Sequence, residues 1–472
     1  MATFMLQSPP VTAVLLAGGG GSRLYPLNAS GTPKVLLPVA NRPLLSFPLR
    51  MLEESGVADV FVVCEGDMAA QAVRAWLANG YTGGLKVEVV RVAEGLPPVD
   101  ALRAVLDRVT THNFVLLSGD VVAEASLRVQ LLTHYVREAA MTALFGRRKV
   151  LATQETKPGR APKNVDYVGL TDGDRLALYV HSPDAVKHLL LPPSFLRRFP
   201  DIKIRTDLVD MQVYVFHTAT LKAVLAANEK IKRLEEQLVP HMIRYQLKPH
   251  RSVGAEEAAS LAAARSSGSG GGSDGLGGLE GSLADLSLSG MSGSSSAATG
   301  AAAAAGQRAE WYCCAYLAPE GSFCQRANTL QGFADVNRDV ITPQNAPRVL
   351  FDEPNPRFEN FVAGSVTVGT RANVSPATMV GPDSCLEERA SVKRSVVGAG
   401  CHLGAGTKVV NSVLMDDVRT GPNCAIHNCV LSAGCVLGEG ARLRDCQLAP
   451  GYAVPAGAEL TEEVLPPPVL RD

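Results

Sequence analysis

Residues 11–45, VTAVLLAGGGGSRLYPLNASGTPKVLLPVANRPLL, join a short apolar run to four glycines and then to a Pro-Lys pair. The first six residues have the apolar, β-branched composition of a buried parallel strand. The glycines at 18–21 remove every Cβ where the chain must turn, so backbone N–H groups can approach a phosphate closely. Arg23 and Lys34 add positive charge. The same pattern also suits a tight strand-to-helix turn with two solvated cations.

Beyond this stretch, helical and strand patterns alternate as they do in βαβ units. We predict helices over 44–54, 68–79 and 100–109, and strands over 59–64, 86–91 and 114–117. Ligands of such sheets gather beyond the carboxyl ends of the strands, where the glycines and Asp120 should lie. Asp120 is our candidate Mg²⁺ ligand, and the alternative is an Asp that caps the next turn. The candidate nucleotide-binding residues are Gly18, Gly19, Gly21, Ser22, Arg23 and Lys34.

The composition changes sharply after residue 251, and residues 266–306 are almost entirely Gly, Ser and Ala. Such a stretch has too little apolar mass to offset chain entropy, so it predicts a disordered linker. A strand over 211–216 and helices over 220–227 and 231–246 close the first domain. We therefore divide the chain into an α/β domain (1–253), a linker (254–309), a connecting segment (310–345) and a repeat domain (346–465).

A 17-residue repeat occupies the last of these regions. Apolar residues recur at intervals of six, six and five, as in Val397, Leu403, Val409, Leu414, Thr420, Ile426 and Leu431. Glycines stand at the corners, and the period predicts a hexapeptide parallel β-helix. Some β-helices are acyltransferases that use a corner histidine, and His402 and His427 are the candidates for that role. Neither has an identifiable acid or base companion, which favours assembly as the role of the β-helix.

Composition limits the partners. The chain has 472 residues, 46% of them apolar, and a net charge of −1. Its net charge therefore gives no attraction to nucleic acid or to an anionic membrane. No early segment has the features of a targeting peptide, and no apolar run reaches the length of a membrane span. We expect a cytosolic protein.

The spacing of the opening stretch resembles that of the sugar-nucleotide pyrophosphorylase family. Leu-Ala-Gly-Gly-x-Gly-Ser-Arg-Leu stands at 16–24, and the rest of the motif falls on Pro33, Lys34, Leu36, Pro38, Pro43 and Leu44. The resemblance implies a Rossmann-like α/β nucleotidyltransferase domain with a nucleoside triphosphate on the glycine loop. It also implies that Asp120 would hold Mg²⁺ and that the β-helix is left-handed.

Three departures from that family argue against its reaction. Its Gly-Thr-Ala nucleobase segment is replaced by Pro97-Pro98-Val99, and its Glu-Lys-Pro sugar-phosphate segment by residues 179–183, YVHSP. The segment that carries a second metal carboxylate is missing, with Asp207 and Asp210 as unsupported substitutes. Because phosphoryl-type transfer depends on positioning and charge neutralisation, we expect no nucleotidyltransferase activity, no required cofactor, and at most vestigial nucleotide or Mg²⁺ binding.

Segments spread along the chain are similar to the gamma-subunit family of translation initiation factor 2B. They include residues 33–49, 208–210, 238–240, 324–330, 390–401 and 411–415. The resemblance implies a non-catalytic scaffold subunit of the complex that exchanges GDP for GTP on initiation factor 2. Its expected partners are the epsilon and other subunits of that complex and initiation factor 2, without direct nucleic-acid or membrane contact. The alternatives are a divergent ADP-glucose or GDP-mannose pyrophosphorylase and a sugar-nucleotide-binding regulatory subunit.

Overall fold

The computed structural model describes residues 10–19, 21–148, 165–181, 189, 191, 193–246, 312–350 and 353–467. Apart from residues 245 and 246, all of these belong to one compact unit. The predicted linker (254–309) and Gly20 lie outside the described residues.

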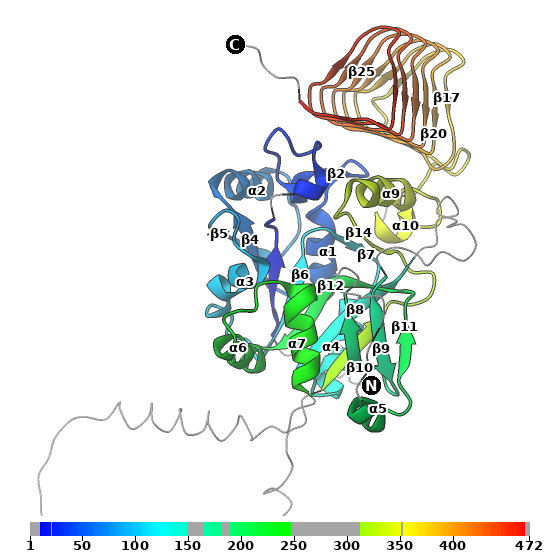
Figure 1. Ribbon diagram of the computed structural model, residues 1–472. Coiled ribbons are helices and arrows are strands. Elements are labelled where there is room, and N and C mark those ends of the chain that lie inside the picture. Colours follow the sequence, from blue (N-terminus) through cyan, green and yellow to red (C-terminus); the bar gives the residue numbers. More distant parts are fainter. Residues whose placement is uncertain are drawn as a thin grey trace, which may run out of the picture. The chain divides into compact units, whose positions relative to one another are not determined.

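A ten-stranded mixed sheet forms the α/β domain, in the order β11-β9-β10-β13-β8-β12-β6-β1-β4-β5 (Figure 1). Strand β1 pairs in parallel with both β4 and β6, and its residues Ala13, Val14 and Leu15 are fully buried. The predicted βαβ order is confirmed. The strands are β1 (Thr12–Leu16), β4 (Asp59–Glu65), β5 (Lys86–Val92), β6 (Asn113–Ser118), β8 (Met141–Arg147), β9 (Tyr167–Thr171), β10 (Arg175–Val180), β11 (Lys203–Arg205), β12 (Leu208–His217) and β13 (Cys313–Leu317).

Helices connect these strands and cover the sheet. They are α1 (Ser46–Glu54), α2 (Asp67–Asn79), α3 (Pro98–Leu106), α4 (Leu127–Val136), α5 (Pro193–Arg198), α6 (Thr218–Ala227) and α7 (Val239–Tyr245). Single 3₁₀ turns, η1 (Ser22–Leu24) and η2 (Lys34–Leu36), follow β1, and a π turn, η5 (Leu234–Leu238), precedes α7. A short hairpin, β2 (Pro38–Val39) and β3 (Arg42–Pro43), leads into α1.

The segment that the sequence assigns to a connection supplies parts of the α/β domain. Strand β13 lies inside the ten-stranded sheet, antiparallel to β10 and parallel to β8. Strand β14 (Cys324–Arg326) then pairs with β7 (Val121–Ala123), and helix α9 (Leu330–Val340) follows. A domain boundary at residue 253 therefore leaves out a central strand. Five apolar residues cannot reveal which distant strands they pair with, which is why the sequence gives no sign of this insertion.

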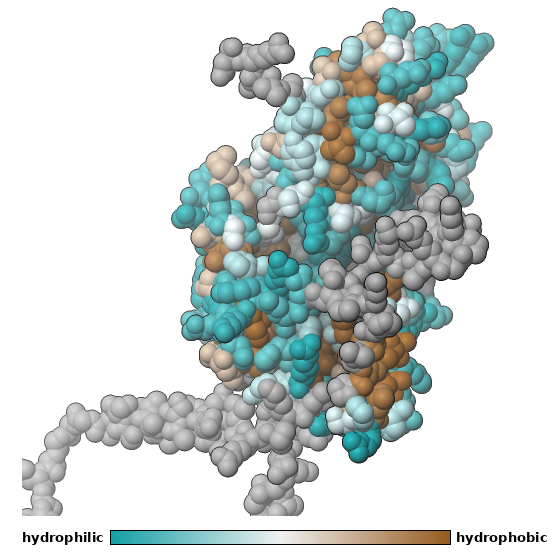
Figure 2. Space-filling model, viewed as in Figure 1, coloured by the Kyte–Doolittle hydropathy of each residue, from teal (hydrophilic) through white to brown (hydrophobic). Residues whose placement is uncertain are grey.

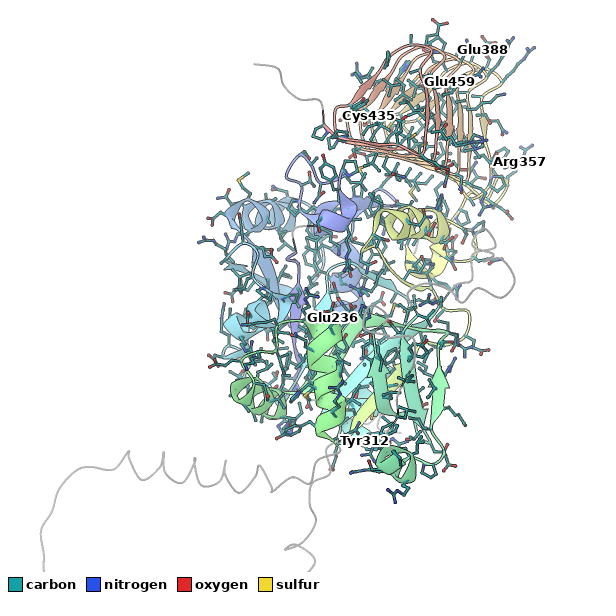
Figure 3. All side chains as sticks on the ribbon, in the orientation of Figure 1. Glu236, Tyr312, Arg357, Glu388, Cys435 and Glu459 are labelled. Atoms are coloured by element: carbon teal, nitrogen blue, oxygen red, sulfur yellow. The ribbon has the colours of Figure 1, made fainter. Side chains whose placement is uncertain are left out.

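The β-helix has three faces, each a parallel sheet built from one strand per coil. The predicted 17-residue period is confirmed, since Val397 pairs with Leu414 and Leu414 with Leu431. The first strand begins at Phe361, and residues 346–349 form helix α10 (Ala346–Val349) instead. Inward side chains stack from coil to coil, among them the buried Cys435 (Figure 3). The first face contains β15 (Phe361–Val362), β18 (Met379–Val380), β21 (Val396–Val397), β24 (Val413–Leu414), β27 (Val430–Leu431), β30 (Gln447–Leu448) and β33 (Val464–Leu465).

The second face contains β16 (Thr367–Val368), β19 (Cys385–Leu386), β22 (His402–Leu403), β25 (Arg419–Thr420), β28 (Val436–Leu437) and β31 (Ala453–Val454). The third face contains β17 (Asn373–Val374), β20 (Ser391–Lys393), β23 (Lys408–Val410), β26 (Ala425–His427), β29 (Arg442–Arg444) and β32 (Glu459–Thr461). The side of the β-helix that carries β17 and β20 is strongly hydrophilic (Figure 2).

The first face is apolar on the outer side of four coils, which the rest of the unit covers. Its residues Met379, Val396, Val413 and Val430 share an apolar cluster with α9 and with the turns after β1. Two polar contacts fix this packing. Asn41 Nδ2 donates to the carbonyl of Val397 at 2.9 Å, and Arg338 Nη1 donates to that of Asn411 at 3.1 Å.

The close stacking of coils makes one glycine substitution costly. A Cβ added to Gly404 would lie 2.5 Å from the carbonyl carbon of Gly421 in the next coil, whereas one added to Gly364 would meet nothing within 4 Å. We expect Gly404→Ala to lower the free energy of unfolding by about 1–3 kcal/mol and Gly364→Ala to change it by less than about 0.5 kcal/mol. Thermal and urea unfolding would measure both, and equal effects would contradict the stacking argument.

Candidate functional site

A cleft of about 520 Å³ opens beyond the carboxyl ends of β1, β4 and β6. The structure brings together here all the candidate residues predicted from the sequence. Residues lining the cleft include Gly18, Gly19, Gly21, Ser22, Arg23, Lys34 and Asp120. Pro97 and Pro98 line it as well, at the start of α3, and neither has a backbone N–H to offer a ligand.

In the glycine loop, a backbone amide binds the side-chain carboxylate of Glu65. Gly19 has a φ of +100°, a backbone conformation that glycine adopts without strain. Its N–H donates to Glu65 Oε1 at 2.6 Å. The other oxygen of Glu65, at the end of β4, accepts from the N–H of Gly95 at 3.3 Å. The Gly19 amide, in the loop predicted to bind phosphate, is therefore already hydrogen-bonded to a carboxylate.

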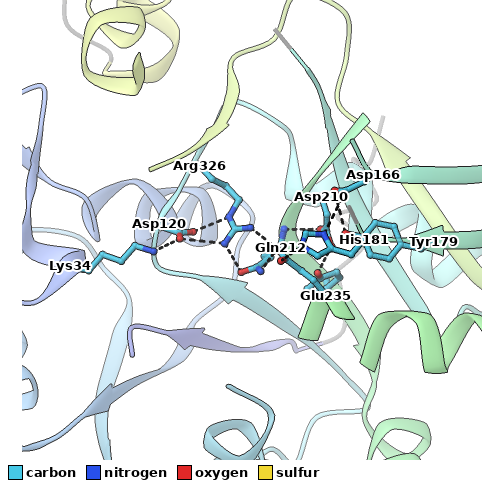
Figure 4. Close-up of polar contacts among 10 residues, drawn as sticks. Lys34, Asp120, Asp166, Tyr179, His181, Asp210, Gln212, Glu235 and Arg326 are labelled. Carbon is cyan, nitrogen blue, oxygen red and sulfur yellow. Dashed lines mark hydrogen bonds and ion pairs between the residues drawn. The ribbon is translucent and has the colours of Figure 1, made fainter. Parts of the chain in front are cut away.

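Asp120 lies between two cations (Figure 4). It follows β6, is 1% exposed, and contacts the ammonium group of Lys34. Arg326, from β14, donates through Nε to Oδ1 at 3.1 Å and through Nη2 to Oδ2 at 3.3 Å. Burial by itself would raise the pKa of Asp120, but the charges of Arg326 and Lys34 outweigh it and hold that pKa well below its usual range.

This arrangement does not fit a divalent cation. Both oxygens of Asp120 are engaged by positive groups, which would repel Mg²⁺ at the same place. Among the residues that the structure describes, no group of three or more His, Cys, Asp or Glu side chains could hold a metal ion. Of the proposed substitutes, Asp207 pairs with Arg205 Nε at 2.9 Å, and neither Asp207 nor Asp210 lines the cleft.

Arg326 extends the polar network along the cleft, whose lining includes Arg326, Glu235 and Gln212. Its Nη1 donates to Glu235 Oε1 at 2.6 Å and its Nη2 to Gln212 Oε1 at 2.7 Å. The backbone N–H of Gln212 donates to Asp210 Oδ1 at 2.8 Å, and the hydroxyl of Tyr214 donates to Oδ2. In the predicted replacement for the sugar-phosphate segment, His181 Nδ1 lies 3.0 Å from Asp166 Oδ1. The last two residues of that segment, Ser182 and Pro183, lie outside the described residues.

Asp210 should make stability depend on pH. Burial, reinforced by the charge of Glu235, raises the pKa of Asp210 to about 7. The folded state therefore keeps a proton that the unfolded state loses above about pH 4, so stability falls as pH rises from about 4 to 7 and then levels off. We expect Asp210→Asn to remove a slope of up to about 1.4 kcal/mol per pH unit.

Urea unfolding at intervals between pH 4 and 8 would measure this slope. Asp207→Asn is the matched control, because the hydrogen bond from Arg205 lowers the pKa of Asp207. The stability that ionised Asp207 contributes should therefore be lost as the pH falls through that lowered pKa, and not as the pH rises. An unchanged slope in Asp210→Asn would contradict the assignment.

Four residues of the site were not predicted: Glu65, Gln212, Glu235 and Arg326. Arg326 contacts Asp120 across 206 residues, and Glu65 contacts the glycine loop across 46. A single residue that lies so far along the chain from its partner belongs to no local motif, so the sequence does not reveal the contact. Both β-helix histidines lie on outer faces. His402 does have an acidic neighbour, contrary to the prediction, because its Nε2 lies 3.3 Å from Glu387 Oε1, whereas His427 is exposed.

None of the helices in the described part of the chain combines the length and the apolar composition needed to cross a membrane. Two family models match the chain. One, described as a nucleotidyl transferase, covers residues 12–161, and the other, described as the LbH domain of the EIF2B epsilon subunit, covers residues 357–460. These matches fall on the N-terminal α/β strands and on the β-helix, and they confirm the predicted fold class.

The gamma subunit of translation initiation factor eIF2B from Dictyostelium discoideum is 24% identical over 395 residues, which cover 81% of this chain and 86% of the relative. Its counterpart in Schizosaccharomyces pombe is 28% identical over 249 residues, covering 51% and 53%. The eIF2B epsilon subunit of Dictyostelium discoideum is 27% identical over 219 residues, covering 44% and 30%. The chain is thus similar to eIF2B gamma subunits over most of its length, as the sequence motifs predicted.

Proposed function

We propose that this chain is a gamma-type subunit of eIF2B, the complex that exchanges GDP for GTP on translation initiation factor 2, and that it acts in assembly rather than in catalysis. The similarity to gamma subunits spans the α/β domain and the β-helix together. Its partners would be the epsilon and other eIF2B subunits and initiation factor 2, without direct nucleic-acid or membrane contact, in the cytosol.

The position of Arg326 carries the proposal that the α/β domain is not an enzyme. A nucleotidyltransferase needs a divalent cation to neutralise the phosphates of its nucleotide, and Asp120 is the carboxylate expected to hold it. Here a guanidinium group and an ammonium group take both oxygens of Asp120. Two further features argue against catalysis. The carboxylate of Glu65 on the glycine loop repels a phosphate, and Pro97 and Pro98 in the cleft wall have no backbone N–H to bind one. No cofactor would be required.

Reassembly of eIF2B with and without this chain tests the assembly role. The other subunits would come from the same organism, and the readout would be the release of labelled GDP from initiation factor 2. We expect the chain to copurify with the epsilon subunit and its omission to lower the exchange rate. A chain that forms a stable homotetramer, and whose omission leaves exchange unchanged, would overturn the proposal.

The second candidate is a sugar-nucleotide pyrophosphorylase with divergent motifs. It is favoured by the nucleotidyl transferase match and by the gathering of the glycine-loop residues at one cleft. Pyrophosphate release from ATP or GTP with Mg²⁺ and a hexose 1-phosphate separates the two candidates. A pyrophosphorylase would release pyrophosphate, whereas we expect no release above background. A sugar-nucleotide-binding regulatory subunit would instead show thermal stabilisation by a sugar nucleotide without any pyrophosphate release.

A further inference from the structure

The outer sides of the three β-helix faces differ in chemistry. The first is apolar in four coils, at Met379, Val396, Val413 and Val430, which α9 and the turns after β1 cover. The second presents one Lys or Arg on its strands, Arg419. The third presents four exposed cations, which we call the basic face: Lys393, Lys408, Arg442 and Arg444.

Little negative charge balances the basic face. Glu459 (labelled in Figure 3) is the one acidic residue on the six strands of this sheet, and it pairs with Arg442 at 3.0 Å. Within the described part of the chain, Lys393, Lys408 and Arg444 form no ion pair. The other acids of the coils stand at the corners: Asp383, Glu387, Glu388, Asp416, Asp417, Glu439, Asp445, Glu462 and Glu463.

The β-helix holds these cations at fixed spacings. Neighbouring coils lie about 4.8 Å apart, so Lys408 and Arg442, two coils apart, are separated by about 10 Å. Arg442 and Arg444 lie on the same side of one strand, about 6.6 Å apart, which is close to the spacing of alternate side chains in an extended peptide. Because the strands are hydrogen-bonded in every coil, the backbone that carries the cations is already ordered, and a ligand would immobilise only their side chains.

We propose that the basic face docks an acidic, extended polypeptide segment of a partner protein. Two features favour a polypeptide over a nucleic acid. Residues 353–467 contain nine Lys and Arg but twelve Asp and Glu, whereas nucleic-acid-binding domains are basic overall. The six strands of the third face also carry no Phe, Tyr or Trp on which a base could stack. This docking surface is independent of the state of the α/β cleft.

Charge reversal on two faces of the full-length protein tests the proposal. The variant Lys393→Glu/Lys408→Glu/Arg444→Glu changes the basic face. The matched control, Arg357→Glu/Arg371→Glu/Arg419→Glu, changes the net charge equally at exposed positions elsewhere on the same domain. The probes are a labelled oligoglutamate peptide and a uridine oligonucleotide of equal charge, followed by fluorescence anisotropy at low and at physiological salt, with thermal unfolding as a check on folding.

We expect the native chain to bind oligoglutamate at low salt, with an affinity that falls as salt screens the charges. The basic-face variant should bind at least about tenfold more weakly, while the control retains its binding. The proposal is overturned if the native chain does not bind oligoglutamate, if both variants lose binding equally, or if the oligonucleotide binds more tightly than the peptide.

Discussion

Replacing Arg326 by Met should lower the free energy of unfolding by about 3–5 kcal/mol, because it leaves buried charges without their partner. The Arg326 side chain is only 11% exposed and joins Asp120, Glu235 and Gln212. Without the guanidinium group, Asp120 keeps only Lys34, and Glu235 keeps no cation of comparable proximity among the described residues. Urea unfolding followed by circular dichroism measures the loss.

Two further variants separate charge from general packing. Arg326→Lys keeps the charge but lacks the planar fork, so it should cost less than Arg326→Met and more than nothing. Adding Asp120→Asn to Arg326→Met should recover part of the loss, with a coupling of about 0.5–3 kcal/mol in the double-mutant cycle. A loss below about 1 kcal/mol in Arg326→Met, or strictly additive effects, would show that the network is unimportant for folding.

Replacing Glu65 by Ala should create affinity for inorganic pyrophosphate. In the native chain the carboxylate takes the Gly19 amide and repels a second anion, whereas the variant leaves that amide, beside the Arg23 guanidinium that lines the same cleft, to a phosphate. We expect Glu65→Ala to bind pyrophosphate at least about tenfold more tightly than the native chain in calorimetric titration.

Glu53→Ala is the matched control for this experiment. Glu53 also accepts a bond from a glycine amide, that of Gly84 at 2.6 Å, but it does not line the cleft. Its removal should leave pyrophosphate binding unchanged. Equal affinities of the native chain and Glu65→Ala would mean that the carboxylate does not compete for the loop.

What the sequence predicts depends on how local the interactions are. The β-helix was predicted coil by coil because each inward residue, such as Leu414, stacks on one 17 residues away. The glycine loop and Asp120 were predicted because strand ends of a parallel sheet must converge. Strand β13 and Arg326 were missed, since their partners lie far away along the chain and neither carries a periodic pattern.

The central position of β13 also has a consequence for synthesis on the ribosome. While the first 253 residues emerge, β8 and β10 have no strand between them, so both keep an open, hydrogen-bonding edge. The sheet becomes complete only after residue 317 has left the exit tunnel, many residues later. Until then the open edges of β8 and β10 leave the nascent chain prone to strand-to-strand aggregation.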